Sequence, residues 1–239
     1  MHDYSLSDLL QLIQRPDPET KRLPIFSDSI LKSAELIEML EYKTISIQRV
    51  PYKNPPRGLP AEEQTMFDKG IIVVNESISP KPAHREAYEF IRAQSKPRMI
   101  GWYLVRLPYR GIVQRAMDNG LMQSHKRWFF YETILTEKGS NIVRKAKLDI
   151  DTYLASDAAD TSKLSNQSCL IIALLVNSYT WNSVYSKLYK GRTKAQKIAL
   201  QEKVILAANK AQIKGDTDNN LELILNGLSH TYAVGNTIM

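Results

Sequence analysis

Two arginines, Arg106 and Arg110, lie on either side of a predicted helix start, where their side chains could bind an anion. Pro108 suits the first position of that helix, because its missing N–H has no acceptor there and its φ is already helical. A helix N-terminus carries partial positive charge, so cations beside it are unfavourable unless an anion neutralises them. The spacing therefore favours a phosphate held by free amides and two guanidinium groups. The alternative interpretation is that both side chains extend into water.

The residues that follow predict a β-hairpin. Gly120 would supply the left-handed cap of a helix that ends at about Asn119. Two strand-like runs over residues 121–135 then flank a basic turn. A helix followed by a hairpin, here over residues 109–135, has the outline of a winged helix, a fold that many DNA-binding proteins use.

The wing of such a fold would carry three basic side chains, His125, Lys126 and Arg127. The preceding helix contains only two, Arg110 and Arg115, whereas a helix that reads base edges is rich in Arg, Lys, Asn and Gln. Nucleic acid is therefore a disfavoured partner, although the winged helix stays open as an alternative.

The common catalytic and metal-binding motifs do not occur in the sequence. There is no Gly-rich phosphate loop, and the four histidines lack the spacing of a metal site. These histidines are His2, His84, His125 and His230. Glu35, Glu38 and Glu41 are predicted to lie on the solvated face of a helix. We therefore expect no enzymatic activity, no metal and no cofactor.

The overall charge favours an anionic partner. The chain has 239 residues, a net charge of +7 and a pI of about 9.3, and we interpret this excess as spread thinly along the chain. The apolar run at residues 169–176 begins with Cys169, the one cysteine, and is shorter than the ~18 residues of a membrane span. We expect this run at the centre of the core, and a soluble protein that would meet a membrane from the side.

Hydrophobic periodicity predicts a mainly α-helical fold. Residues 26–42 form an amphipathic helix on which Ile30, Ala34 and Ile37 share a line. Lys32 lies roughly 200° around this helix from Ile30, so its side chain is predicted to point away from the core. The rest of the chain beyond about residue 109 is mostly helical apart from the hairpin.

Two strands are predicted between the second helix and the later helices. Residues 43–50 alternate in polarity, and residues 71–75 provide the partner strand. The Pro-rich residues 51–69 between them are predicted to form a surface loop.

Several stretches, in order along most of the chain, carry a family resemblance. They are YSLSDLLQLIQ (4–14), SDSILKSAELIEMLEYKTISI (27–47), EAYEFIRA (86–93), MIGWYLVRL (99–107), IVQRAMDNGLMQSHKRWFFYETILTEKG (112–139) and SNQSCLIIALLVNSYTWNSVY (165–185). They resemble successive helices and the basic hairpin of the Golgi phosphoprotein 3-like family, which has eukaryotic and many bacterial members. Tyr42 and Lys43 stand where that family has an Arg-Gly turn.

The resemblance implies one compact, mostly α-helical domain over residues 1–239 that binds peripherally to a membrane. Its location would be cytoplasmic, and at the Golgi if the chain is eukaryotic. Eukaryotic members of the family bind phosphatidylinositol 4-phosphate and the cytoplasmic tails of Golgi glycosyltransferases. An anionic membrane lipid and such tails are therefore the expected partners, and self-association is left open.

The headgroup pocket implied by the resemblance falls on four residues of this chain. Lys32 stands where the family has an arginine in its second helix, and Arg106 and Arg110 match a later pair of arginines. Phe26 is the aromatic residue nearest to the position of the family's tryptophan. We expect these side chains to meet in one exposed basic pocket that binds an anionic headgroup. A protein-interaction scaffold is a further alternative.

Overall fold

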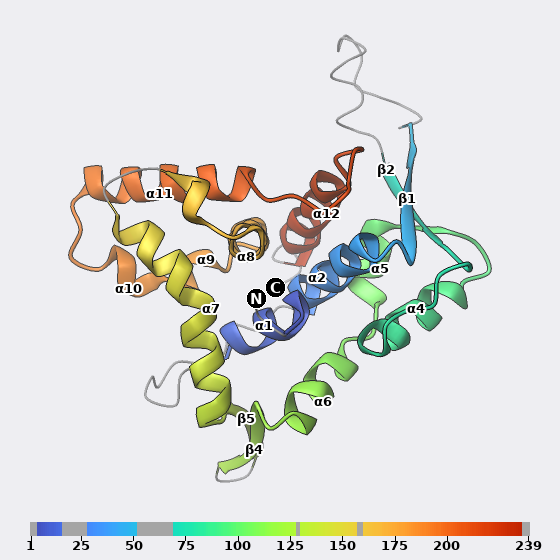
Figure 1. Ribbon diagram of the computed structural model, residues 1–239, viewed down its shortest axis with the longest axis horizontal. Helices are drawn as coiled ribbons and strands as arrows, with labels where there is room; N and C mark the ends of the chain where they lie inside the picture. The colour runs from blue at the N-terminus through green and yellow to red at the C-terminus, as the bar shows by residue number, and fades with distance from the viewer. Residues whose placement is uncertain (1–3, 16–27, 52–68, 128–129, 157–159, 236–239) are drawn as a thin grey trace.

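The computed structural model describes residues 4–15, 28–51, 69–127, 130–156 and 160–235 (Figure 1). In these residues the chain is mainly α-helical, with one three-stranded sheet and one hairpin, which confirms the predicted fold class. The elements in chain order are α1 (Leu6–Ile13), α2 (Asp28–Glu41), β1 (Ile45–Val50), β2 (Lys69–Val74), the 3-10 helix η2 (Pro82–His84), α4 (Arg85–Arg92), β3 (Arg98–Met99), α5 (Ile100–Arg106), α6 (Arg110–Asp118), β4 (Met122–Arg127), β5 (Phe130–Leu135), α7 (Glu137–Ala155), the 3-10 helix η3 (Thr161–Lys163), α8 (Asn166–Asn177), α9 (Trp181–Val184), α10 (Ser186–Tyr189), α11 (Lys194–Asn209) and α12 (Asn220–Gly235).

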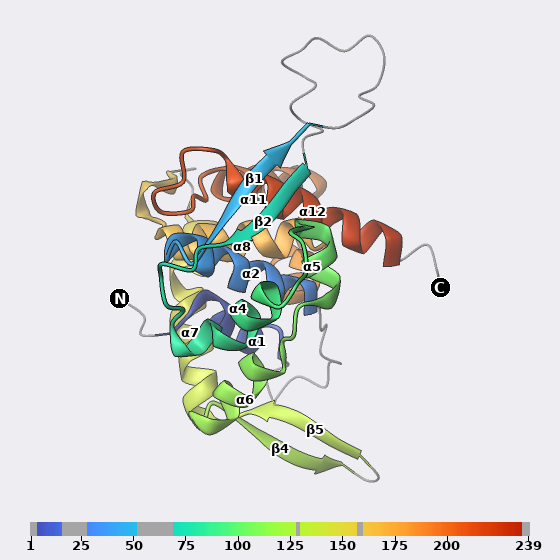
Figure 2. The same cartoon turned by 90° about the vertical axis from the view of Figure 1, so that its right-hand side faces the viewer.

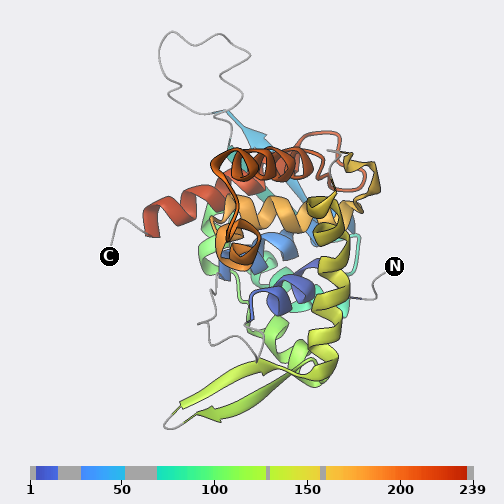
Figure 3. The same cartoon turned by 90° about the vertical axis from the view of Figure 1, so that its left-hand side faces the viewer.

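The α8 helix forms the centre of the core, as its apolar run predicts. Every residue from Ser168 to Leu175 is buried. The helix packs against α1, α2, α7, α9, α11 and α12 (Figures 1 and 3). Only full coverage of this kind stabilises a helix that is apolar all round. Burial also raises the pKa of the Cys169 thiol, which makes it a poor nucleophile. In the described part of the chain, no helix combines the length and apolar character needed to cross a bilayer.

The α2 helix is buried on all sides, which corrects the amphipathic helix predicted from its sequence. All residues from Ile30 to Met39 are buried. The helices α1, α5, α8 and α12 all pack against it. Its polar side chains therefore need partners inside the protein, because a buried polar group without a hydrogen bond costs free energy.

The sheet confirms the predicted pairing of the first two strands. β1 and β2 are antiparallel, with Ile45 opposite Val74 and Val50 opposite Lys69, and β3 pairs with the other edge of β2. Lys69 therefore belongs to a strand and not to the predicted loop. Residues 52–68 of that loop lie outside the described residues.

The α6 helix begins at Arg110, two residues later than the sequence predicts. Leu107 leaves α5 with an extended backbone, at φ −57° and ψ 135°. This conformation is expected before a proline, since the ring of Pro108 disfavours helical backbone at the preceding residue. Pro108 therefore separates two helices and does not begin the second one.

The end of α6 and the hairpin follow the prediction. Gly120 has a φ of +66°, and the N–H of Leu121 donates to the carbonyl of Ala116 at 2.8 Å, which is a Schellman cap. β4 and β5 then pair from Met122 opposite Leu135 outward. Figures 2 and 3 show that this hairpin extends away from the helices.

Candidate anion-binding site

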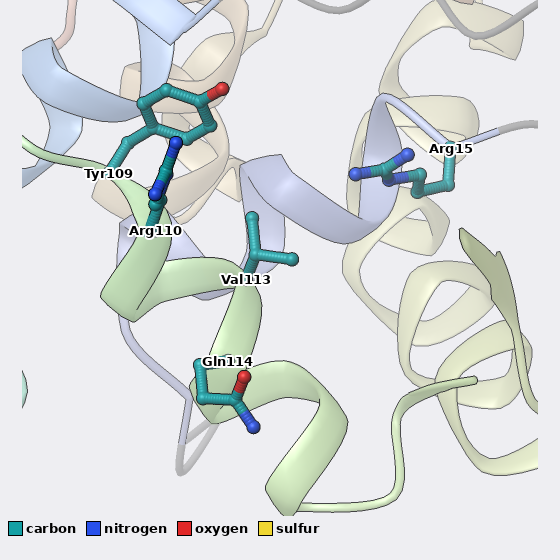
Figure 4. A pocket seen from close by; sticks show the side chains of 5 residues that line it. All are labelled: Arg15, Tyr109, Arg110, Val113 and Gln114. Carbon is teal, nitrogen blue, oxygen red and sulfur yellow. The ribbon is translucent and has the colours of Figure 1, made fainter. Parts of the chain in front are cut away.

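An open pocket of about 440 Å³ lies beside the start of α6 (Figure 4). Its lining residues are Arg15, Tyr109, Arg110, Val113 and Gln114. Arg15 follows the end of α1, whereas the other four come from the first turns of α6 and the residue before it. The pocket therefore depends on the packing of α1 against α6. It holds two guanidinium groups, a phenol and an amide around an apolar wall.

Of the predicted site residues that the structure describes, Arg110 alone lines this pocket. Its side chain is exposed at the first position of α6, where Figure 4 shows it beside the ring of Tyr109. The amides of α6 contribute less than the sequence suggests, because the N–H of Gly111 already donates to the carboxylate of Glu86 at 3.0 Å. Guanidinium groups must therefore supply most of the attraction for an anion here.

Lys32 lies behind the pocket and not in it, which corrects the prediction that it points to solvent. Its side chain is buried because α5 covers this side of α2. Its ammonium group donates to the carbonyl of Val105 at 2.8 Å and lies 5.6 Å from the centre of the Tyr109 ring. Burial lowers the pKa of Lys32, and the nearby carboxylate of Asp28 opposes that shift.

Asp28 connects Lys32 to the pocket. Its carboxyl group is hydrogen-bonded to the Tyr109 hydroxyl and lies close to the Lys32 ammonium group. Burial raises the pKa of Asp28, and the charge of Lys32 acts against this effect. The pKa of Tyr109 is raised by burial and by Asp28. Lys32 and Asp28 thus hold the Tyr109 ring in place from behind.

Arg106 lies outside the pocket, at the last position of α5. A cation is favourable at a helix C-terminus, so the argument that an anion must neutralise this residue does not apply to it. Its guanidinium group lies 5.5 Å from the centre of the Trp102 ring. Phe26, the fourth predicted residue, lies outside the described residues.

The outer face of α5 combines basic and apolar side chains. Trp102 stacks on Phe90 and lies 5.4 Å from the Arg98 guanidinium carbon as well as near Arg106. Met99 and Val105, which share this face by helical spacing, are 46% and 63% exposed. Sequence reasoning did not single out these side chains as one surface, because it placed Trp102 only within a short helix.

Sequence reasoning also missed Arg15. Nothing in its local sequence marks it as functional, since it follows a helix end and precedes a proline. Burial lowers its pKa, with Tyr109 acting in the opposite direction. Only the contact between α1 and α6, which are about a hundred residues apart in sequence, brings it to the pocket.

A buried polar cluster joins α1, α2, η2 and α6, which corrects the prediction of a solvated face at Glu35 and Glu38. Glu35 lies 3.4 Å from Nδ1 of His84, and both side chains are almost fully buried. Glu38 accepts hydrogen bonds from the backbone N–H of Leu6 at 2.5 Å and from the hydroxyl of Ser7 at 3.0 Å. Burial raises the pKa of both carboxyl groups, that of Glu38 to about 7.

Arg115 extends this cluster from α6. Its guanidinium group contacts Asp8 at 3.2 Å and donates to the carbonyl of Ala83 at 2.5 Å. It therefore faces the interior of the protein and is unavailable to a DNA groove. His125 and Lys126 are exposed on β4, and the side chain of Arg127 lies outside the described residues. In a winged-helix protein α6 would be the helix that reads DNA, and one of its two arginines, Arg115, is thus used for contacts inside the protein.

No group of three or more His, Cys, Asp or Glu side chains in the described ranges could hold a metal ion. The buried carboxylates instead act as hydrogen-bond acceptors and partners of His84 and Arg115. No known family model matches the chain, and no curated protein matches it.

Proposed function

We propose that the protein is a peripheral membrane protein that binds the anionic headgroup of a lipid at the pocket beside α6. The observation that carries this proposal is the position of Arg15 and Arg110, which line one open pocket from the end of α1 and from the start of α6. Guanidinium groups form paired, charge-assisted hydrogen bonds with phosphate oxygens. A phosphate in this pocket could accept hydrogen bonds from both guanidinium groups.

The other lining residues suit the same ligand. The amide of Gln114 can donate to a hydroxyl or phosphate oxygen, and the Tyr109 ring, fixed by Asp28, provides a flat wall for an inositol or glycerol unit. Lys32 adds positive charge behind that ring. The lipid that the family resemblance implies, phosphatidylinositol 4-phosphate, fits this chemistry, because its phosphomonoester carries more negative charge than a phosphodiester.

The outer face of α5 supports an approach to a membrane. Exposed Met99 and Val105 flank Trp102, whose ring lies near the guanidinium groups of both Arg98 and Arg106. Aromatic and apolar side chains beside arginines are suited to the boundary between headgroups and acyl chains. This face ends at Arg106, and the α6 side of the pocket begins with Tyr109, so the two features adjoin along the chain.

The test compares vesicles that contain phosphatidylinositol 4-phosphate with phosphatidylserine vesicles of equal total charge. We expect the wild-type chain to prefer the phosphomonoester. The Arg15→Ala/Arg110→Ala variant should lose this preference, by roughly tenfold for each charge-assisted contact. Arg85→Ala/Arg144→Ala removes two exposed arginines from α4 and α7 and serves as the matched control. A wild-type chain without the preference, or a double variant that keeps it, would refute the pocket.

A further inference from the structure

The net charge of the chain is concentrated in one segment, which corrects the interpretation that it is spread thinly. Residues 187–214 contain eight basic side chains and one acidic one, Glu202, so their net charge of +7 equals that of the whole chain. The basic residues are Lys187, Lys190, Arg192, Lys194, Lys197, Lys203, Lys210 and Lys214. The other residues of the chain therefore have a net charge of zero. This segment comprises the end of α10, the whole of α11 and the residues after it.

The α11 helix has apolar side chains on two opposite faces. Leu200, Val204 and Ala207 are buried, and this face packs against α8. On the other face Ile198, Ile205 and Leu206 are 47%, 53% and 48% exposed. Burial against α8 therefore explains only half of the apolar residues of this helix. We use the name α11 surface for the exposed apolar side chains Ile198, Ile205 and Leu206 together with the basic residues of segment 187–214.

Lysines border this apolar stripe on both sides. At 100° per residue, Lys194 and Lys197 lie on one side of the stripe, and Lys203 and Lys210 lie on the other. The ammonium groups of Lys203 and Lys210 donate to the backbone carbonyls of Ser156 and Thr161. Among the described residues, none of the eight basic side chains forms an ion pair with a carboxylate.

We infer that the α11 surface lies on the surface of an anionic lipid bilayer. Ile198, Ile205 and Leu206 would enter the boundary between headgroups and acyl chains, while Lys194 and Lys197 reach lipid phosphates and carboxylates. This arrangement is typical of helices that lie in the plane of a membrane surface. Each lysine near an anionic leaflet adds to the attraction, and the attraction weakens as salt screens it.

Other occupants fit the surface less well. A second copy of the chain would bring two surfaces of charge +7 together, and their repulsion opposes association. A nucleic acid would use the lysines but leaves the exposed Ile and Leu side chains without a role. Seven of the eight basic residues are lysines, which lack the bidentate geometry that favours arginine at specific phosphate contacts.

The α11 surface is distinct from the pocket beside α6. The two helices lie at opposite ends of the molecule in Figures 1 and 3. The inference therefore goes beyond the proposed headgroup pocket and does not depend on it. It predicts binding to bulk anionic lipid, without preference for a particular headgroup.

The experiment measures binding of the full chain to vesicles of phosphatidylcholine alone and of phosphatidylcholine mixed with phosphatidylserine. We expect binding only to the mixed vesicles, and weaker binding as salt rises. Lys190→Glu/Lys194→Glu/Lys197→Glu should weaken it by roughly a hundredfold, and Ile198→Ser/Ile205→Ser/Leu206→Ser by roughly tenfold. Glu202→Gln removes the one acidic group of α11 and should strengthen binding. All these residues are exposed, so the variants should fold.

Matched controls use exposed residues elsewhere. Arg85→Glu/Lys96→Glu/Lys126→Glu changes the net charge equally on α4, the segment after it and β4, and Leu148→Ser removes an apolar side chain that is 60% exposed on α7. Both controls should bind better than the corresponding α11 variants. Equal losses in controls and variants would overturn the inference, as would unchanged binding in the α11 variants. Retention on duplex DNA or an acidic peptide without vesicle binding would also overturn it. Arg15→Ala/Arg110→Ala should leave phosphatidylserine binding intact, so failure of the pocket and failure of this surface are separable.

Discussion

The carboxylate of Glu38 caps the first turn of α1 through Ser7, whose hydroxyl donates to it at 3.0 Å. The backbone N–H groups of Leu6 and Ser7 donate to the same carboxylate, at 2.5 and 3.4 Å. A helix start carries N–H groups without intrahelical partners, and here a side chain of α2 satisfies two of them. α1 is only eight residues long, and a helix of this length is marginal by itself, so contacts with α2 such as this one help to stabilise it.

The stability of the protein should fall as pH rises from about 4.5 to about 7. Burial raises the pKa of Glu38 from 4.5 to about 7, so the folded state binds this proton more tightly than the unfolded state. The stabilisation is complete below the unfolded pKa and is lost as pH rises through the folded one, a change on the order of 3 kcal/mol. Urea unfolding of the wild-type chain and of Glu38→Gln across this range measures it. The variant should show a flatter dependence, and parallel curves would contradict the assignment to Glu38.

Arg115→Met should destabilise the fold by about 2–4 kcal/mol, because it leaves the carboxylate of Asp8 and the carbonyl of Ala83 without their cation. The Arg115 and Asp8 side chains are only 24% and 12% exposed, so water replaces the lost contacts poorly. Chemical denaturation gives the free energy of unfolding. Arg144→Met, at an exposed arginine of α7 bonded to Asn141, is the control and should change stability by less than about 0.5 kcal/mol.

Lys32→Met should reduce stability by about 1–3 kcal/mol and should reduce headgroup binding less than Arg110→Ala does. The substitution keeps the volume of the side chain but removes the donor to Val105 and the positive charge beside Asp28. Thermal unfolding and vesicle binding measured on the same preparation separate the two effects. A stable Lys32→Met protein that has lost binding would instead place Lys32 in direct contact with the ligand.

Gly120→Ala and Gly101→Ala should change stability in opposite directions. At either position an added Cβ meets no described atom within 4 Å, so packing does not distinguish them. Gly120 has a φ of +66°, where alanine costs about 1–2 kcal/mol, whereas Gly101 lies within α5, where alanine gains about 0.5–1 kcal/mol. The shift of the unfolding midpoint in urea tests this pair. A stabilised Gly120→Ala variant would contradict the role of the Schellman cap.

Local sequence was sufficient to predict the principal helices and strands before about residue 136 and a mostly helical remainder. The apolar run around Cys169 indicated a helix buried on all sides, and Gly120 indicated the end of α6. The alternation over β1 indicated a strand and its partner. Each of these features depends on the spacing of side chains within one element or on the φ of one residue, so no knowledge of distant residues is required.

Only the tertiary structure decided which polar side chains face water. Lys32, Glu35 and Glu38 have the spacing of a solvated face, yet α1, α5 and η2 cover them and supply their partners. The same packing brings Arg15 beside Arg110 and turns Arg106 toward Trp102. The sequence by itself determined the order of the elements and the concentration of charge in residues 187–214. The composition of the pocket depended on contacts between residues far apart in the chain, which helical periodicity does not encode.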